Sequence, residues 1–440
     1  MTLAERLHQH PFQAYAYSYP HKMAYRQLDP SVPLEPLWSH EDRQALFLYI
    51  HIPFCEMRCG FCNLFTTTNP DADHVDVYFK ALERQMRTMG QILGTHQFAR
   101  AAFGGGTPTF FSESEITRLF GMIGRHLTRL APGAPVSFEM SPATVTPGKM
   151  KLLVELGVTR ASLGVQSFLP SETRSLGRPQ DPAQVSQALD CMRNAGFRVL
   201  NIDLIYGAQN QTRASWLHSL REAMRYVPEE LYLYPLYVRP LTGLKKLLRE
   251  PSDLRLDLYQ HGRNFLLERG YEQISMRLFR RSGAFAESAS GPIYCCQEDG
   301  MVGLGPGARS YTRAVHYSSE YAVGRSGIQQ IIGAFAKRSS EGFAIADYGC
   351  VLNSEEQRRR FVIKSLLRSD GLDRSAYSEN FGSDPSWDFP ELLELFEHGL
   401  ATESDNEIIL TPAGIERSDT IGPWLFSTET LTRIEQYELV

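Results

Sequence analysis

Three cysteines in one short segment are the residues of this chain whose spacing best suits a metal cluster. Cys55, Cys59 and Cys62 stand in the sequence YIHIPFCEMRCGFC, which covers residues 49–62. Thiolates at this spacing on a compact loop can each bind one iron of a four-iron cluster, which leaves the fourth iron without a protein ligand. Such an iron can bind and reduce a small molecule, whereas a fully ligated cluster only carries electrons. The spacing therefore favours an enzyme over an electron carrier.

The last two cysteines also fit a less specific interpretation. Cys59 and Cys62 alone could form a zinc site or a redox pair. Zinc would need a further ligand, and the candidates nearby are His51 and His74. The third cysteine and the aromatic residue between the last two favour the iron–sulfur cluster, and a zinc-stabilised binding module remains the alternative.

The other four cysteines do not suggest a disulfide framework, because the total of seven is odd and the chain is long. We expect Cys191 and Cys350 to be reduced thiols that pack as small buried residues. Cys295 and Cys296 are adjacent and must point in different directions. Core packing is therefore favoured over metal ligation for this pair.

Composition and charge exclude several classes of protein. The chain has 440 residues, of which 42% are hydrophobic and 22% charged, as in ordinary soluble proteins. Its net charge of −5 and the lack of a Lys/Arg stripe argue against nucleic-acid binding. Residues 1–13 carry no apolar signal-peptide core, and no run approaches the ~18 apolar residues that span a membrane. We expect a cytoplasmic protein.

Strand and helix patterns alternate from residue 46 onward. Apolar strand-like runs are predicted at 46–51, 98–103, 136–140, 160–166, 199–206 and 231–238. Helical spacing is predicted at 75–93, 112–127, 147–156, 182–195 and 214–226, with Ser112 and Glu115 as a capping box. Such alternation is typical of a parallel sheet with right-handed crossovers.

Polar or glycine-rich signals follow many of these strands, at Cys55, 104–107, Glu139, Gln166 and Asp203. Chemistry at many successive strand ends favours a barrel over an open doubly wound sheet, in which ligands bind at one crevice. The fold class is therefore expected to be α/β, with a complete or partial parallel barrel.

Four segments make up the expected domain organisation. Residues 1–44 are rich in Tyr and Pro and predict an arm packed on a domain surface and covering a cleft. Residues 45–240 form the barrel, and residues 241–345 extend it on the substrate side. Residues 346–440 predict a small C-terminal domain that resembles a winged helix, with helices at 354–367 and 389–400 and a strand at 408–411.

Five segments, in order, resemble one known family. They are the cysteine segment 49–62, GGGTPT at 104–109, EMSP at 139–142, GVQSF at 164–168 and NIDLIYG at 201–207. On these motifs the chain resembles radical S-adenosylmethionine (SAM) enzymes of the oxygen-independent coproporphyrinogen III oxidase type. The resemblance implies a partial (β/α)6 TIM barrel that holds a [4Fe-4S] cluster on Cys55, Cys59 and Cys62.

The resemblance also implies two SAM sites. Tyr49, Gly105, Gly106 and Glu139 match contacts to the SAM on the cluster, and glycines let a ligand approach the backbone. A second SAM would contact Phe61, Gly106, Thr107, Gln166, Arg178 and Asp203, with Arg178 suited to a carboxylate. Tyr237 and Arg309 match the same site but stand where the family pattern has small apolar or aliphatic residues, so the cavity is expected to differ there. No catalytic side chain is implied.

The implied reaction is reductive cleavage of SAM to a 5′-deoxyadenosyl radical and methionine, followed by hydrogen abstraction from the substrate. An oxidase of this type converts propionate side chains to vinyl groups. Alternatives are radical C-methylation or cyclopropanation with the second SAM, and a haem-binding chaperone on the same fold. The implied partners are an acidic tetrapyrrole and a one-electron donor such as flavodoxin or ferredoxin, and we expect a monomer that binds neither nucleic acid nor membrane. The sequence MRLFRR at 276–281 could bind substrate carboxylates, although a solvated basic strand edge is favoured.

Overall fold

Six parallel strands form the centre of one curved sheet. The computed structural model describes residues 2–9, 11–16, 18–127, 130–246, 253–284 and 294–438. The central strands follow each other in chain order: β2 (Leu46–Ile52), β5 (Phe98–Gly105), β6 (Val136–Met140), β7 (Arg160–Gln166), β8 (Val199–Tyr206) and β9 (Glu230–Pro235). Their bounds lie within three residues of those predicted from the sequence, and the α/β partial barrel is confirmed.

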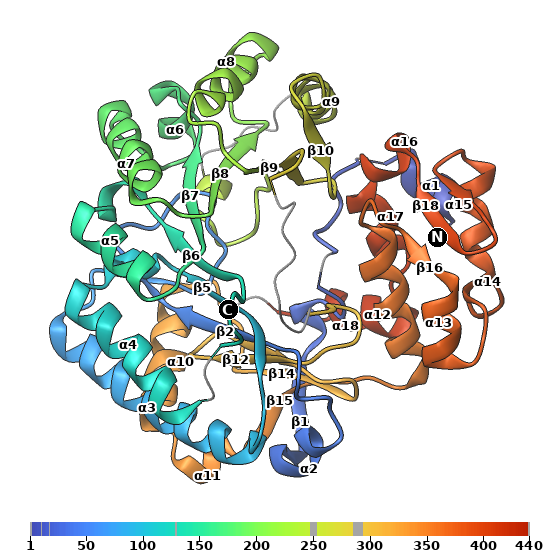
Figure 1. Cartoon of the computed structure of the whole chain (residues 1–440). Coiled ribbons are helices and arrows are strands. Elements are labelled where there is room, and N and C mark those ends of the chain that lie inside the picture. Colours follow the sequence, from blue (N-terminus) through green and yellow to red (C-terminus); the bar gives the residue numbers. More distant parts are fainter. Residues whose placement is uncertain are drawn as a thin grey trace.

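Helices cover the convex outer face of this sheet, as Figure 1 shows. They are α3 (Ala72–Leu93), α4 (Glu113–His126), α5 (Pro147–Glu155), α6 (Pro170–Ser175), α7 (Pro182–Ala195), α8 (Arg213–Met224) and α9 (Arg255–Leu267). The capping box predicted at the start of α4 is present, since the Ser112 side chain accepts from Glu115 N and the Glu115 carboxylate accepts from Ser112 N. The short helix α6 lacks a full apolar repeat and was not predicted.

The central sheet is extended at both edges, to 13 strands in all. β11 (Leu278–Arg281) pairs antiparallel with β9, and β10 (Tyr271–Gln273) follows it. At the other edge β12 (Met301–Leu304) runs parallel to β2, followed by β13 (Arg309–Tyr311), β14 (Val315–Ser318), β15 (Ile345–Val351) and β1 (Arg26–Pro33). Among the described residues no ladder joins β10 to β1, so the barrel is open.

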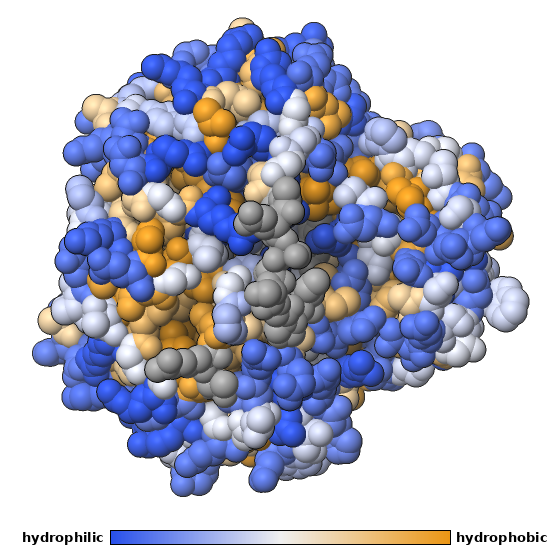
Figure 2. Space-filling model, in the orientation of Figure 1, coloured by the Kyte–Doolittle hydropathy of each residue, from blue (hydrophilic) through white to orange (hydrophobic). Residues whose placement is uncertain are grey.

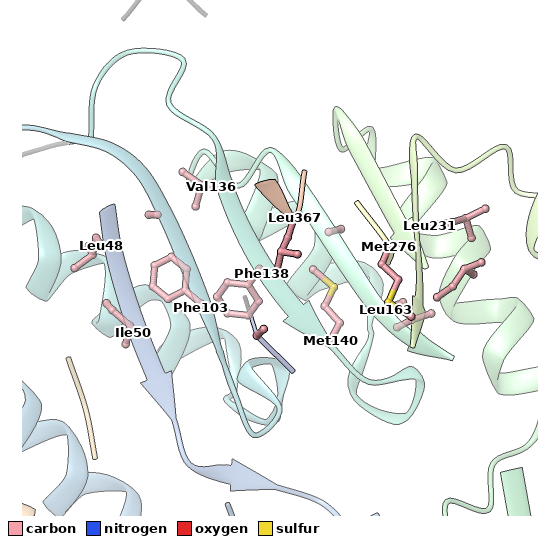
Figure 3. Close-up of a cluster of buried hydrophobic side chains, with 14 of the residues drawn as sticks. Leu48, Ile50, Phe103, Val136, Phe138, Met140, Leu163, Leu231, Met276 and Leu367 are labelled. Atoms are coloured by element: carbon pink, nitrogen blue, oxygen red, sulfur yellow. The ribbon is translucent and has the colours of Figure 1, made fainter. Parts of the chain in front are cut away.

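The core lies between the sheet and its outer helices. Ile50, Phe103 and Phe138 are in register on β2, β5 and β6 and are fully buried (Figure 3). The rings of Phe103 and Phe138 lie 5.2 Å apart. Because side chains alternate between the faces of a strand, residues one position away point to the concave inner face. That face receives Tyr49 and Glu139.

The C-terminal lobe, residues 354–438, stands beside the open edge of the barrel (Figure 1). It contains a three-stranded antiparallel sheet and short helices: α12 (Ser354–Leu366), β16 (Leu372–Asp373), α13 (Arg374–Phe381), α14 (Pro385–Asp388), α15 (Leu393–Glu397), β17 (Ala401–Glu403), β18 (Glu407–Leu410), α16 (Pro412–Ile415), α17 (Ser418–Trp424) and α18 (Thr428–Glu435). The helix predicted over 389–400 is wrong in extent. A 3-10 turn at Pro390–Leu392 precedes α15, and Gly399 is left-handed with φ +65°.

The N-terminal segment splits between the lobe and the sheet. The Leu3 N–H donates to the Glu394 carboxylate at 2.8 Å, and the Tyr19 ring lies 5.0 Å from that of Phe426. Beyond residue 25 the chain enters the sheet as β1, paired with β15. The interpretation of residues 1–44 as a surface arm therefore misses a strand, because its partner lies more than 300 residues away in the sequence.

The remaining elements are short or peripheral. They are α1 (Leu3–Leu7), η1 (Lys22–Ala24), α2 (Leu34–Ser39), β3 (Phe54–Cys55), β4 (Thr67–Thr68), η2 (Pro108–Phe110), η3 (Pro142–Thr144), η4 (Gly243–Lys246), α10 (Arg325–Lys337) and α11 (Ser340–Phe343). None of the helices in the described part of the chain is both long and apolar enough to cross a bilayer. Figure 2 shows one face on which hydrophilic residues predominate and apolar ones form small patches.

Candidate active site

The cysteine loop begins where β2 ends and is held in place by its neighbours. The two-residue strand β3, which includes Cys55, pairs in parallel with β4. The Gly60 N–H donates to Gly177 O at 3.1 Å, and the Leu244 N–H donates to Gly60 O at 2.8 Å. The loop is therefore fixed at the carboxyl end of the first barrel strand, where a barrel places its chemistry.

Each of two cysteine sulfurs accepts a hydrogen bond from a residue of the predicted site. The Thr107 hydroxyl donates to Cys55 Sγ at 3.5 Å, and Arg178 Nη1 donates to Cys59 Sγ at 3.2 Å. Burial, together with the neighbouring Cys62 and Cys59 thiols and opposed by the Thr107 bond, raises the pKa of Cys55 to about 12. Positive charge from a metal cluster would be required for such thiols to ionise at neutral pH.

The cysteine loop offers three thiolates as a donor set. Among the described residues no group of three His, Cys, Asp or Glu side chains is arranged to hold one metal ion. A zinc ion holds each sulfur at about 2.3 Å and would draw them together, whereas a four-iron cluster takes each thiolate at a different iron. The donor set therefore fits an iron–sulfur cluster.

Neither histidine considered as a zinc ligand is available. His51 bonds through Nε2 to Phe65 O at 2.8 Å and through Nδ1 to the Tyr49 hydroxyl at 3.2 Å. Burial, despite the Phe65 bond, lowers the pKa of His51 to about 4, so the ring is neutral. His74 is exposed and bonds to Asp71 at 2.6 Å.

The glycine strip has a packing function that its sequence did not reveal. Gly105 has φ +108°, and a Cβ there would lie 2.5 Å from the His51 ring. A Cβ on Gly106 would lie 2.3 Å from Phe54 O. The Gly106 and Thr107 N–H groups donate to Ile52 O and Phe54 O, both at 2.7 Å. The strip therefore lets β5 approach the cysteine loop closely.

A row of polar side chains crosses the inner face beside this loop. A Cβ on Gly104 would lie 3.4 Å from Glu139 Cγ, and the strand register places Glu139 opposite Ser162 and Ser162 opposite Asn201. Asn201 Nδ2 donates to Asp203 at 2.7 Å. Burial raises the pKa of Glu139, and repulsion from the Asp203 carboxylate raises it further. Both carboxylates can accept hydrogen bonds from ligand hydroxyls or an ammonium group.

Gln166 and Arg178 lie together on the far side of the row. Gln166 has φ +67° at a bulge between β7 and β8, and its amide lies near the Cα of Gly164. Arg178 Nη2 donates to Gly164 O at 2.9 Å, while its Nη1 contacts Cys59. Phe61 packs on the apolar group formed by Leu176, Ile205, Ala208, Leu236 and Leu244. Of the predicted residues, Thr107 and Arg178 thus contact the cysteine loop, Phe61 belongs to it, and Gln166 lies beside Arg178 at Gly164.

Tyr237 and Arg309 connect this region to other parts of the chain. The Tyr237 hydroxyl donates to Asp419 in the C-terminal lobe. Arg309 Nη1 donates to the Ser18 hydroxyl at 3.1 Å, in the N-terminal segment. Neither Asp419 nor Ser18 carried a signal in the sequence, because both reach the site only through the tertiary fold.

The arginines of segment 276–281 form internal ion pairs; the interpretation as a solvated strand edge is wrong for Arg277, which is buried, whereas the Arg280 and Arg281 side chains are 32% and 40% exposed. Arg277 forms a buried ion pair with Asp419 at 2.6 Å. Two further pairs join Arg280 to Glu230 at 3.0 Å and Arg281 to Glu229 at 2.9 Å. These acidic partners lie at the start of β9, just before it, and in the lobe, so the pairing could not be seen from the segment alone.

All seven cysteines are free. Cys350 is buried as expected, whereas Cys191 is only half-buried. Cys295 and Cys296 are also half-buried, so core packing does not describe them; their thiols donate to the side-chain oxygen of Gln297 at 3.4 and 3.1 Å.

Comparison with known sequences places this geometry in a family. The radical SAM superfamily matches residues 49–223, which begin at Tyr49 and include the cysteine loop, the glycine strip and the polar row. These residues are a radical SAM domain. Besides the three cysteines, its lining includes Tyr49 on β2, Arg178 after α6, and residues on or after the strands β5 to β8.

Relatives match well beyond that domain. A heme chaperone, HemW, of Bacillus subtilis is 29% identical over 376 residues, covering 83% of this chain and 95% of its own length. An oxygen-independent coproporphyrinogen III oxidase of Pseudomonas aeruginosa is 29% identical and covers 86% of this chain and 83% of its own length. The structure of coproporphyrinogen III oxidase (HemN) from Escherichia coli, 25% identical, superimposes with a TM-score of 0.79 over 93% of this chain and 96% of that one.

Proposed function

We propose that this radical SAM protein is an oxygen-independent coproporphyrinogen III oxidase. The observation that carries the proposal is the three-cysteine loop at the end of β2, set beside the carboxylates Glu139 and Asp203 in a fold shared with an oxidase over 93% of the chain. Bound together, a [4Fe-4S] cluster and SAM supply one-electron cleavage of the sulfonium bond and a carbon radical that removes hydrogen from substrate.

The residues of this chain have separate tasks in that reaction. Cys55, Cys59 and Cys62 would hold the cluster, and Arg178 and Thr107 would donate hydrogen bonds to its sulfur ligands. Glu139 and Asp203 would accept hydrogen bonds from SAM, helped by Tyr49 beside Gly104. The apolar outer core keeps water from the sheet, and the lobe stands at the barrel's open side.

The proposal includes a second SAM and an external electron source. Gln166, Arg178 and Asp203 would contact the second molecule, with Phe61 and Thr107 at its edge, and the contact of Arg178 with Cys59 Sγ supports a position next to the cysteine loop. A flavodoxin or ferredoxin would supply electrons to the monomer. Equilibrium dialysis of the anaerobic holoenzyme with labelled SAM would measure the number bound, and a single SAM per chain would remove this part of the proposal.

Anaerobic turnover tests the main proposal. The reconstituted protein is incubated with SAM, dithionite and coproporphyrinogen III, and the nucleosides and tetrapyrroles are analysed by mass spectrometry. We expect 5′-deoxyadenosine and loss of carbon dioxide from the substrate, both abolished in Cys59→Ala. S-adenosylhomocysteine together with a methylated product would instead show a C-methyltransferase.

A haem chaperone is the second candidate, because HemW of Bacillus subtilis matches 83% of the chain. A chaperone would bind haem stably and form no decarboxylated tetrapyrrole. Haem titration followed by gel filtration distinguishes the two: co-elution of stoichiometric haem, without tetrapyrrole turnover, would support the chaperone.

A further inference from the structure

Three basic side chains from separate segments form a group beside the cysteine loop, which we call the basic cluster. Lys22 comes from η1, Arg239 follows β9, and Arg309 lies on β13. All three are half-buried. Burial lowers the pKa of Lys22 well below its usual value, and the positive charges of Arg309 and Arg239 lower it further. The charges of Arg309 and Arg239 therefore act on Lys22, and Ser18, which accepts a hydrogen bond from Arg309, precedes Lys22 by four residues in the chain.

These side chains contact aromatic rings and one hydroxyl group and form no ion pair with a carboxylate of the described residues. Lys22 Nζ lies 3.5 Å from the centre of the Tyr321 ring, and the Arg239 guanidinium lies 4.3 Å from that of Tyr237. Arg309 donates to Ser18 and lies 5.6 Å from the Tyr311 ring centre. In the parts of the chain that the structure describes, no Asp or Glu forms an ion pair with any of the three.

Two other arginines of the barrel do form ion pairs with carboxylates of the chain. Arg277 lies below 5% exposure and is paired with Asp419, and Arg160 is paired with Glu230 at 2.7 Å. Positive charge removed from water is costly unless an anion compensates it. Arg277 and Arg160 are each paired with a carboxylate of the chain, whereas the basic cluster has no such partner among the described residues. This difference points to a bound anionic ligand at the basic cluster.

The basic cluster is connected to the cysteine loop through Tyr321. The hydroxyl of Tyr321, whose ring carries Lys22, donates to Asn63 O at 2.9 Å, and Asn63 follows Cys62 in the chain. Arg58 of the same loop donates to Val323 O. A ligand held by the basic cluster would therefore lie next to the place where the radical forms.

We propose that Lys22, Arg239 and Arg309 bind the carboxylates of a polycarboxylate substrate. Three cations on three segments suit several separated anionic groups better than one compact anion, and guanidinium groups bind carboxylates through two parallel hydrogen bonds. SAM carries one carboxylate beside a positive sulfonium and a positive ammonium group, so three cations suit it less well than they suit a polycarboxylate. The inference rests on the proposed oxidase function, and it assigns substrate recognition to side chains outside the radical SAM domain.

Binding without turnover tests the assignment. The anaerobic holoenzyme, loaded with SAM but given no reductant, is titrated with coproporphyrin III and with its tetramethyl ester in the same detergent, and tryptophan quenching is followed. The ester keeps the ring and removes the four negative charges. We expect the free acid to bind at least about tenfold tighter, because only the acid can form charged hydrogen bonds with these side chains.

Variants locate the effect. Arg309→Met and Lys22→Met should each reduce free-acid affinity about tenfold and leave ester affinity unchanged. Arg225→Met, which removes an arginine with 73% side-chain exposure that is paired with Glu222, should change neither. Equal affinity of the wild type for acid and ester, or loss of SAM rather than porphyrin in the variants, would overturn the assignment.

The same preparations separate this inference from the proposed function. Addition of dithionite without porphyrin measures SAM cleavage in the wild-type holoenzyme. If cleavage occurs but the free acid is not preferred, the basic cluster assignment fails and the radical chemistry stands. If the acid is preferred but SAM is not cleaved, the proposed oxidase function fails while the anion site remains.

Discussion

At the scale of single residues, Arg178 connects the predicted ligand site to the cluster ligands. Its guanidinium donates to Cys59 Sγ at 3.2 Å, and positive charge near a cluster favours the reduced state. We predict that Arg178→Met lowers the midpoint potential of the reconstituted cluster by roughly 60 mV, the one-electron equivalent of about 1.4 kcal/mol. An EPR-monitored redox titration measures this.

The conservative variant separates charge from packing. Arg178→Lys keeps the charge and should recover at least half of the shift, with cluster content checked by iron and sulfide analysis. A potential in Arg178→Met that equals or exceeds that of the wild type would contradict this role for the residue.

His51 gives a prediction about pH. Burial lowers its pKa to about 4 in the folded state, against about 6.5 when unfolded. Between pH 6.5 and 4, His51 is therefore protonated in the unfolded chain and neutral in the folded chain. The free energy of unfolding falls as the pH drops through this range. In His51→Gln this contribution is absent, so the stability gap between variant and wild type should change by roughly 2–3 kcal/mol between pH 7 and 4.5. Urea unfolding of cluster-free protein at the two pH values measures it, and parallel pH profiles would exclude it.

At the scale of elements, the contact between β2 and β5 depends on one glycine. A Cβ at Gly105 would lie 2.5 Å from the His51 ring, and the residue has φ +108°. We predict that Gly105→Ala destabilises the fold by about 2–4 kcal/mol, through strain and displacement of His51. The matched control is Gly121→Ala in α4, where a Cβ meets nothing within 4 Å and should stabilise the helix by about 0.5–1 kcal/mol. Equal effects of the two substitutions in guanidinium unfolding would show that the close approach is unimportant.

Elements whose signals are local were predictable from the sequence. The strand at 160–166 and the helix at 182–195 were predicted with their observed bounds, because an apolar repeat and a Pro or Gly at the ends specify them. β1 and α15 were not, since β1 depends on pairing with β15 and α15 on a proline turn. The same distinction holds at the site. The three cysteines lie close together in the sequence, whereas the contact of Arg178 with Cys59 joins residues 119 positions apart.

At the scale of the whole molecule, a buried ion pair fastens the C-terminal lobe to the barrel. Arg277, before β11, and Asp419, on α17, are 3% and 0% exposed and lie 2.6 Å apart. The Tyr237 hydroxyl donates to the same carboxylate. Two residues before Arg277, the backbone of Ser275 forms an isolated antiparallel β-bridge with Arg368 of the lobe. The strand edge, the end of β9 and the lobe therefore meet at Asp419.

Breaking this pair should loosen the lobe before the barrel unfolds. Asp419→Asn leaves the Arg277 charge buried without its counterion, at a cost of about 3–5 kcal/mol. We predict faster hydrogen exchange in α12 and α17, measured by mass spectrometry, with β5 to β8 unchanged. The double variant Arg277→Met/Asp419→Leu removes both charges and should restore most of the protection, because apolar side chains of similar volume can replace a buried pair. Uniform exchange throughout the chain in Asp419→Asn would mean that lobe and barrel open as one unit, and the fastening role would be lost.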